Sequence, residues 1–520
     1  MRYSDELFKL IKSLTKSEKR YFKLFASMQG NGKKYLLLFD AIDRQNDYDE
    51  PALKEEFKQE KFVRQFAVVK SYLYNLVLKS LRLYHAGSSI AIQLRELLTN
   101  VELLNDRGLV LQARKMYEKC LELATRHERF SFLFEMSGWE PILCPEMRSS
   151  SNQIDAFAER QQKVCSQMQN LSTYTILLRK VARPVAQDYV RRVEDLEELK
   201  LLMEHPLMEN PEQALSDRGQ FYYHWIYCTY HFAFNEYRES FNHAERMVHL
   251  LEKDPARLQE EFSLYLIAVG NVLTLYRRSG EEEKFQIALE RLRKVAEELV
   301  VTQQLRSPRV AAELFQASYL CLLSYYIGEA EFSQGMQIVP VIEEGLRQHE
   351  SYLQDHIRYK FYSNLSVIYF AVENYDQALH YNNRILLERE PVEGRQTYYA
   401  ARLFNLVIHY ELGNFLLLEH LVPSTYRYLL SRKNKLQLEE DVLSFFRKLP
   451  SITDRKGLID AFTVLRDSLQ EVEQDALLQN GMRYFGYIEW LNSKILNRSF
   501  AEISKEYLRV TENELTEESG

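Results

Sequence analysis

The sequence predicts an all-α protein, because helix-breaking residues are scarce and apolar residues recur at helical spacing. Only 17 Gly and 12 Pro occur among 520 residues, whereas the helix formers Leu, Glu, Lys, Arg and Gln are abundant. No Val- and Thr-rich run alternates polar and apolar residues, so no strand is predicted. The hydrophobic content of 46% is enough to bury a core. We therefore expect helices packed on helices, in a chain too long for one simple core.

Residues 1–89 are expected to form a small basic domain of short helices. The apolar spacing predicts two helices within 4–28, separated by a capping signal at Thr15–Glu18, and a turn at 29–32. Further helices are predicted over 33–44, 52–58 and 62–84, with Pro51 at a first helical position. Residues 1–95 carry a net charge of +7, whereas the remainder carries −14. This change of sign supports a boundary near residue 90.

From residue 90 the sequence predicts helix pairs. Residues 90–210 form a first, divergent part, with helices over 94–105 and 109–126 and no clean repeat between 130 and 210. Residues 211–512 are more regular. Their predicted pairs are 220–235 with 238–253, 262–277 with 282–301, 309–328 with 332–348, 355–371 with 376–388, and 397–412 with 415–431. Closing helices are expected over 439–448, 455–470, 474–496 and 500–510, before an acidic tail at 513–520 that is expected to fray.

The most regular pair, residues 362–390, carries a recognisable pattern. Its first helix places Tyr362, Leu365, Ser366 and Tyr369 at packing positions, and Ala378 follows as a small residue on the second helix. The segment Asn374-Tyr375-Asp376 lies between the helices, and we expect Asn374 to form the turn because Asn tolerates a left-handed backbone.

This stretch resembles one tetratricopeptide repeat. The equivalent packing residues in successive pairs, Ser240, Phe285, Gly335, Ala378 and Leu418, lie 40 to 50 residues apart. The family's usual period is about 34. The helices are therefore expected to be long, in a divergent array similar to bacterial tetratricopeptide regulators and sensors. The resemblance implies a right-handed α-α superhelical solenoid after the N-terminal domain.

An Asn five residues before a Tyr occurs in three first helices, at Asn271, Asn364 and Asn405. The resemblance implies that first helices line a concave groove, where such an Asn bonds the backbone of a bound peptide. An amide side chain suits that role because it both donates and accepts. Bonding between neighbouring helices is the alternative. The residues expected to flank the groove are Lys360, Tyr325 and Arg402.

Four cations near the N-terminus suggest a second kind of surface. Lys16, Lys19, Arg20 and Lys23 lie on adjacent helical turns with aromatic residues between them, a pattern that contacts phosphates in some proteins. A small head on such an array is similar to regulators that bind DNA, but no helix-turn-helix signature is present. Solvated surface charge is the alternative interpretation.

One triplet has the spacing of metal ligands. His224, Cys228 and His231 lie at i, i+4 and i+7, so one helix face presents all three side chains. In the register of the repeat they correspond to Tyr362, Ser366 and Tyr369, which are inward packing positions. No fourth ligand is evident, so packing is the favoured interpretation and no metal is expected.

The sequence has none of the motifs that would indicate an enzyme or a cofactor. It lacks a phosphate-binding Gly-rich loop, a Gly-x-Ser-x-Gly elbow and a His-Glu-x-x-His pair. Its five cysteines are scattered, the first residues are charged, and no long apolar run is present, so a cytoplasmic protein without disulfides is expected. We expect a non-enzymatic scaffold that binds a protein or peptide in its groove, or alternatively a regulator whose head contacts nucleic acid.

Overall fold

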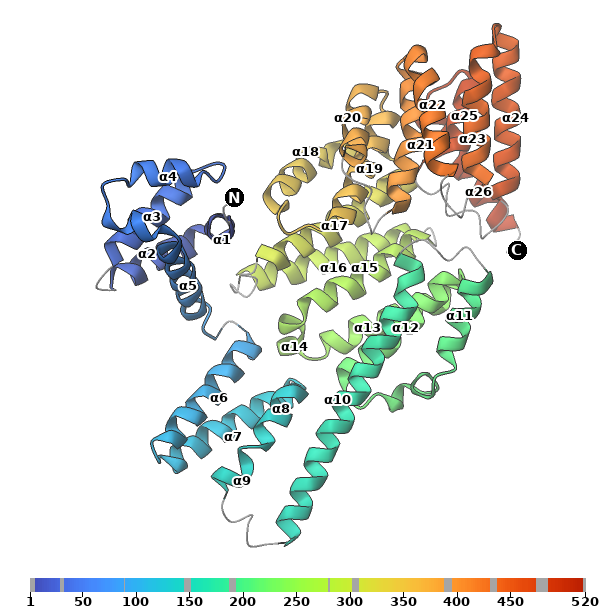
Figure 1. The fold of residues 1–520 in the computed structure, drawn as a ribbon. Helices are drawn as coiled ribbons and strands as arrows, with labels where there is room; N and C mark the ends of the chain where they lie inside the picture. The colour runs from blue at the N-terminus through green and yellow to red at the C-terminus, as the bar shows by residue number, and fades with distance from the viewer. Residues whose placement is uncertain are drawn as a thin grey trace. The chain divides into compact units, whose positions relative to one another are not determined.

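The computed structural model describes residues 5–28, 32–87, 89–144, 151–186, 193–278, 281–301, 308–387, 395–430, 437–473 and 485–517. Within these ranges the regular structure is entirely helical, which confirms the all-α prediction (Figure 1). The chain divides into two units, Met1–Gln161 and Gln162–Gly520. The boundary lies inside the 36-residue helix α10 (Ser151–Ala186), which the sequence analysis did not resolve.

The first part of unit 1 is a bundle of five helices around its own core. They are α1 (Glu6–Ser13), α2 (Lys16–Ser27), α3 (Gly32–Arg44), α4 (Glu50–Glu56) and α5 (Phe66–Tyr84). A 3-10 helix, η1 (Lys61–Gln65), precedes α5 where the sequence predicted one continuous helix from residue 62. The predicted capping box at Thr15 and Glu18 is present, and Pro51 lies in the first turn of α4. The buried core of this bundle runs from Leu7 to Val77.

The rest of unit 1 has a separate small core. The hairpin α6 (Ile90–Asp106) and α7 (Val110–Arg126) is followed by the short helices α8 (Phe130–Ser137) and α9 (Glu140–Leu143). Their buried residues include Leu94, Tyr117 and Met136. Arg160 and Gln161, at the start of α10, bond Glu140 and Ser137. Helix α10 thereby completes this unit with its first turns.

Unit 2 begins with the remainder of α10 and α11 (Val193–Met203). Two 3-10 helices, η3 (Pro206–Met208) and η4 (Pro211–Gln213), each begin at a proline. Asn170 of α10 fixes this connection, because its amide donates to the Gln213 carbonyl and accepts from the Leu215 N–H. The core here joins α10 and α11 to the first helix of the regular region.

The regular region of unit 2 consists of consecutive helix pairs. They are α12 (Asp217–Ala233) with α13 (Tyr237–Glu252), α15 (Phe262–Arg278) with α16 (Glu282–Val301), α17 (Pro308–Gly328) with α18 (Phe332–His349), α19 (Asp355–Ala371) with α20 (Tyr375–Leu386), and α21 (Arg395–Glu411) with α22 (Phe415–Leu430). The short helix α14 (Pro255–Glu260) was not predicted. The first helices also pack on one another in order, α15 on α17, α17 on α19 and α19 on α21.

Each of four turns between paired helices contains one residue with a left-handed backbone. These residues are Asn235, Ala330, Glu373 and Gly413. The turn of the 362–390 pair lies at Glu373-Asn374 as predicted, but the left-handed residue in it is Glu373 and not Asn374. Asn374 instead has φ −90° and caps α20, because its side chain accepts from the Gln377 N–H. The residue before it, Glu373, takes the strained conformation with φ 60°.

Four helices close unit 2. They are α23 (Gln437–Lys448), α24 (Arg455–Glu473), α25 (Tyr487–Leu496) and α26 (Phe500–Glu517). Helix α26 continues past Val510, so the helix is longer than predicted; residues 474–484 and 518–520 lie outside the described ranges. Within those ranges one helix, α17, has the length and composition to span a membrane. It packs against α15, α18 and α19 as part of unit 2.

Candidate functional site

Two of the three predicted groove asparagines bond neighbouring helices. The Asn364 amide donates to the Ser324 hydroxyl on α17 at 2.9 Å. Asn405 is buried, and its side-chain oxygen accepts from Asn382 of α20 at 3.3 Å. These contacts correspond to the alternative interpretation, bonding between helices. Asn271 is half-buried on α15, and within the described residues its side chain makes no hydrogen bond.

The three residues expected to flank the groove have different environments. Tyr325 is 3% exposed and stacks on Phe285 with ring centroids 4.2 Å apart, so it belongs to the core and not to an open surface. Arg402 is half-buried, and its guanidinium lies 4.0 Å from the centre of the Tyr428 ring. Lys360 alone is exposed. The structure therefore does not bring the six predicted residues together on one accessible surface.

The triplet His224, Cys228 and His231 is a packing seam between α12 and α13. The His224 and His243 rings bond through their Nδ1 atoms at 2.9 Å, and His231 stacks on His243. Cys228 contacts the Ser240 hydroxyl at 3.5 Å, and His231 pairs with Glu236. Within the ranges that the structure describes, no group of three or more His, Cys, Asp and Glu side chains could hold a metal ion.

The α19–α20 pair places its own residues at the same seam positions. In both pairs a serine hydroxyl bonds a carbonyl 12 residues away, but in opposite directions: Ser366 of the first helix donates to the Ala378 carbonyl at 2.7 Å, whereas Ser240 of the second helix donates to the Cys228 carbonyl at 2.8 Å. Tyr369 stacks on Tyr381 with centroids 5.6 Å apart, the same separation as between His231 and His243. The histidines therefore occupy positions that aromatic residues fill elsewhere. His243, which completes the seam, was missed because it lies on the second helix.

The N-terminal cations are partly neutralised by acids on α3. Lys19 pairs with Asp43 and Lys23 pairs with Asp40, each at 2.6 Å. Lys16 and Arg20 are exposed. Because paired cations attract phosphates weakly, this helix presents fewer available charges than its sequence suggests.

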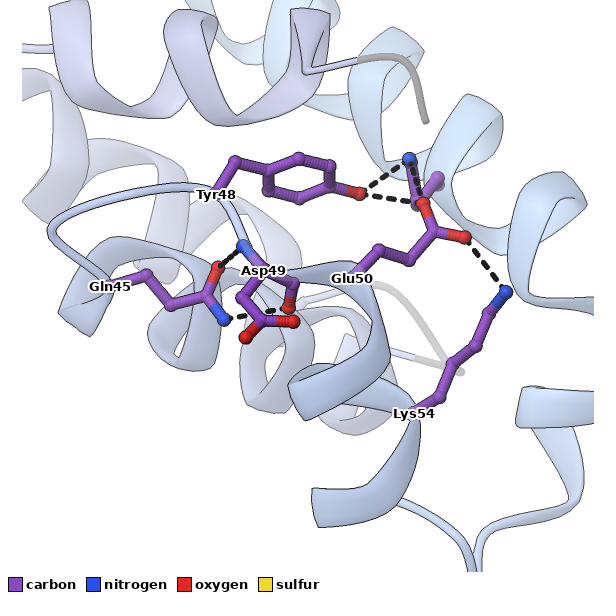
Figure 2. A network of polar contacts seen from close by, with 6 residues as sticks. Gln45, Tyr48, Asp49, Glu50 and Lys54 are labelled. Atoms are coloured by element: carbon purple, nitrogen blue, oxygen red, sulfur yellow. Dashed lines mark hydrogen bonds and ion pairs between the residues drawn. The ribbon is translucent and has the colours of Figure 1, made fainter. Parts of the chain in front are cut away.

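A buried polar network holds the same bundle together (Figure 2). Glu50, which is 6% exposed, accepts from the Tyr48 hydroxyl at 2.8 Å and pairs with Lys54 at 2.8 Å and Lys70 at 2.7 Å. Burial alone would raise the pKa of Glu50, but the bonds from Lys54, Lys70 and Tyr48 outweigh it and lower the pKa to about 2. Burial and Glu50 raise the pKa of Tyr48, so this tyrosine stays protonated and has no acidic reactivity.

An open apolar pocket lies near the end of unit 2. The helices that contribute to it, α21, α22, α23 and α24, pack in succession (Figure 1). Its volume is about 540 Å³, within the range of ligand-binding pockets. Leu418, Val422 and Phe446 are buried residues of its wall. The lining also includes Tyr410, Phe415, Pro423, Leu449, Pro450, Ile452 and Leu458, with Glu419 and Arg447 as its two charged residues.

Exposed apolar side chains continue from this pocket onto the start of α22. Phe415 is 54% exposed, Leu416 81% and Leu417 43%. The signal for this patch is in the sequence, because four successive apolar residues, Phe415 to Leu418, cannot all face one side of a helix. We call Phe415, Leu416, Leu417 and the pocket lining together the α22 surface. An apolar patch joined to a pocket is typical of a protein-binding site.

Comparisons with known proteins do not assign this chain to a family. No protein-family model, no curated protein and no solved structure matches this chain. The resemblance to tetratricopeptide repeats therefore remains an expectation from the sequence residues quoted above.

Proposed function

We propose that this protein is a non-enzymatic, cytoplasmic scaffold that binds a protein or peptide through unit 2. The observation that carries the proposal is the α22 surface, a pocket of about 540 Å³ bordered by three exposed apolar residues. Burying such a surface against a partner is favourable at roughly 25 cal/mol per Å² of apolar area. The five free cysteines are compatible with a reducing compartment.

We also propose that the helix pairs of unit 2 form a right-handed tetratricopeptide-like solenoid. Its support is the ordered packing of α15, α17, α19 and α21 and the matching ring stacks in the α12–α13 and α19–α20 pairs. Such arrays bury a continuous core by stacking and present extended surfaces to partners. Tyr48, Glu50 and His243, whose pKa values are strongly shifted, all bond other side chains inside the packed helices. These contacts favour a structural role for the three residues over a catalytic one.

The proposal is tested by affinity purification of the full chain from its native cells, with mass spectrometry of the retained proteins. The wild type is compared with Leu416→Asp and with Leu387→Asp, a control at an equally exposed leucine on the C-terminal side of α20. A scaffold that uses the α22 surface retains a defined protein with the wild type and the control and loses it with Leu416→Asp. If the wild type retains nothing above a bare matrix, the scaffold function is refuted.

A further inference from the structure

The charges around the α22 surface indicate which kind of partner it fits. The segment 447–456 contributes Arg447, Leu449, Pro450 and Ile452 to the pocket lining, and over its length it contains four cations and a single acid, Asp454. Arg447, Lys448, Arg455 and Lys456 are all exposed, and within the described residues none of them forms an ion pair. Elsewhere in the same unit, cations such as Lys494 and Arg358 are paired with acids.

Arg447 connects these charges to the pocket itself. It lines the pocket, and its guanidinium lies 5.2 Å from the centre of the Tyr426 ring. A guanidinium held over a ring remains available to bind a carboxylate through two parallel hydrogen bonds. Helix α22 contributes one acid, Glu419, to the lining. The pocket lining is therefore mostly apolar with one cation and one acid, and the further cations Lys448, Arg455 and Lys456 belong to the segment 447–456 that contributes to this lining.

We propose, on the basis of the scaffold function above, that the α22 surface binds an amphipathic segment of a partner protein with acidic flanks. An aromatic or branched aliphatic side chain of that segment fills the pocket against Leu418, Val422 and Phe446. Its acidic residues face the segment 447–456, and further apolar residues cover Phe415, Leu416 and Leu417. This arrangement combines a buried anchor, which supplies affinity, with charge complementarity, which supplies specificity and a faster encounter.

The experiment is a selection of phage-displayed random 16-residue peptides on the immobilised full chain. Enriched peptides are synthesised with a fluorescein label, and binding is followed by fluorescence anisotropy at physiological ionic strength. We expect the enriched sequences to carry an apolar anchor with Asp or Glu beside it. The affinity should fall at least about tenfold with Leu416→Asp and with the double variant Arg447→Glu, Lys448→Glu. It should stay within about twofold for Leu387→Asp, because this control changes an exposed leucine outside the surface.

The variants alter exposed side chains, and circular dichroism of each one checks that the helices remain. Enriched peptides with neutral or basic flanks, or binding that Leu416→Asp leaves unchanged, would overturn the proposed partner chemistry while the scaffold function stands. Sedimentation velocity supplies the other contrary outcome. A dimer of the full chain that Leu416→Asp dissociates would assign the surface to a second copy of this chain and refute the acidic partner.

Discussion

At the residue scale, ion pairs inside the N-terminal bundle differ from ion pairs at its surface in how much they contribute to stability. Buried Glu50 pairs with half-buried Lys70 in the N-terminal bundle, whereas the Arg44–Glu56 pair lies at the surface. Breaking a buried pair leaves an uncompensated charge, which costs several kcal/mol, while an exposed pair contributes little. These two pairs therefore provide a matched comparison within one small bundle.

We predict that Glu50→Gln destabilises the bundle by about 3 kcal/mol, because Lys54 and Lys70 both lose their partner. Hydrogen exchange followed by mass spectrometry measures this locally. The amides of α4 and α5 should lose roughly a hundredfold of protection. Glu56→Gln should change protection by less than about fivefold. Equal effects of the two substitutions would contradict the structural role assigned to the buried network.

The histidine seam makes unit 2 sensitive to acid. Burial lowers the pKa of His224 to about 4, and burial together with the neighbouring His224, His231 and Arg246 lowers the pKa of His243 to about 3. Both pKa values lie below the usual histidine value of 6.5. Between the lowered pKa values and pH 6.5, the unfolded chain therefore binds more protons than the folded chain. Stability is therefore complete above about pH 6.5 and declines as the pH falls towards 4.

We predict a loss of up to about 1.4 kcal/mol per pH unit for each of the two histidines below pH 6.5. Urea unfolding at pH 7 and pH 5, followed by circular dichroism, measures the slope. The double variant His224→Leu, His243→Phe should flatten it, because neither replacement titrates. A slope that the double variant leaves unchanged would show that other groups carry the acid sensitivity.

At the element scale, close approach between helices decides which glycines are replaceable. A Cβ added at Gly345 on α18 would clash with the Phe315 ring of α17, which itself stacks on Phe361 of α19. A Cβ added at Gly270 on α15 meets nothing within 4 Å. Alanine is a better helix former than glycine by about 1 kcal/mol, so only the packing distinguishes the two sites.

We predict that Gly345→Ala lowers the stability of unit 2 by about 1–3 kcal/mol, because the overpacked ring must move. Gly270→Ala should raise stability by about 0.5–1 kcal/mol, because its helix gains propensity without a clash. Urea titrations of the two variants beside the wild type test the pair. A stabilising Gly345→Ala would mean that α17 and α18 do not approach as closely as the structure shows.

The paired helices of unit 2 were largely predictable from sequence, because most have an apolar stripe and a break at the end, whereas α10 and α14 were not predicted. The predicted bounds of 332–348 and 355–371 match α18 and α19 to within a residue or two. The site was less predictable. Asn364 and Asn405 share a spacing, but only the packing shows that each bonds a neighbouring helix. The pocket beside α22 depends on the 3-10 helix η5 (Leu449–Ser451), whose Leu449 and Pro450 line it. This helix comes after the last predicted helix pair, so no position of the repeat corresponds to it.

At the scale of the whole molecule, charge and packing divide the chain at different places. The net charge changes sign near residue 90, but the two units meet near residue 161, inside α10. The two boundaries differ because the net charge is set by surface side chains. The unit boundary is set by contacts between segments that are distant in sequence, such as Asn170 with Gln213 and Leu215. The basic character of the first 95 residues is therefore not by itself the mark of a separate functional module.

The N-terminal charge also leads to a prediction for the intact protein. Lys19 and Lys23 are paired with Asp43 and Asp40, whereas Lys16 and Arg20 are exposed and form no ion pair among the described residues. Affinity for DNA depends on the number of phosphates neutralised, so two available cations on this helix support only weak binding with a shallow salt dependence. We expect the full chain at micromolar concentration to leave a duplex of about 30 base pairs unretarded at about 150 mM salt. Electrophoretic mobility shift, repeated at lower salt, measures this. Retardation that persists at about 150 mM salt and disappears with Lys16→Glu and Arg20→Glu would instead identify the head as a nucleic-acid-binding surface.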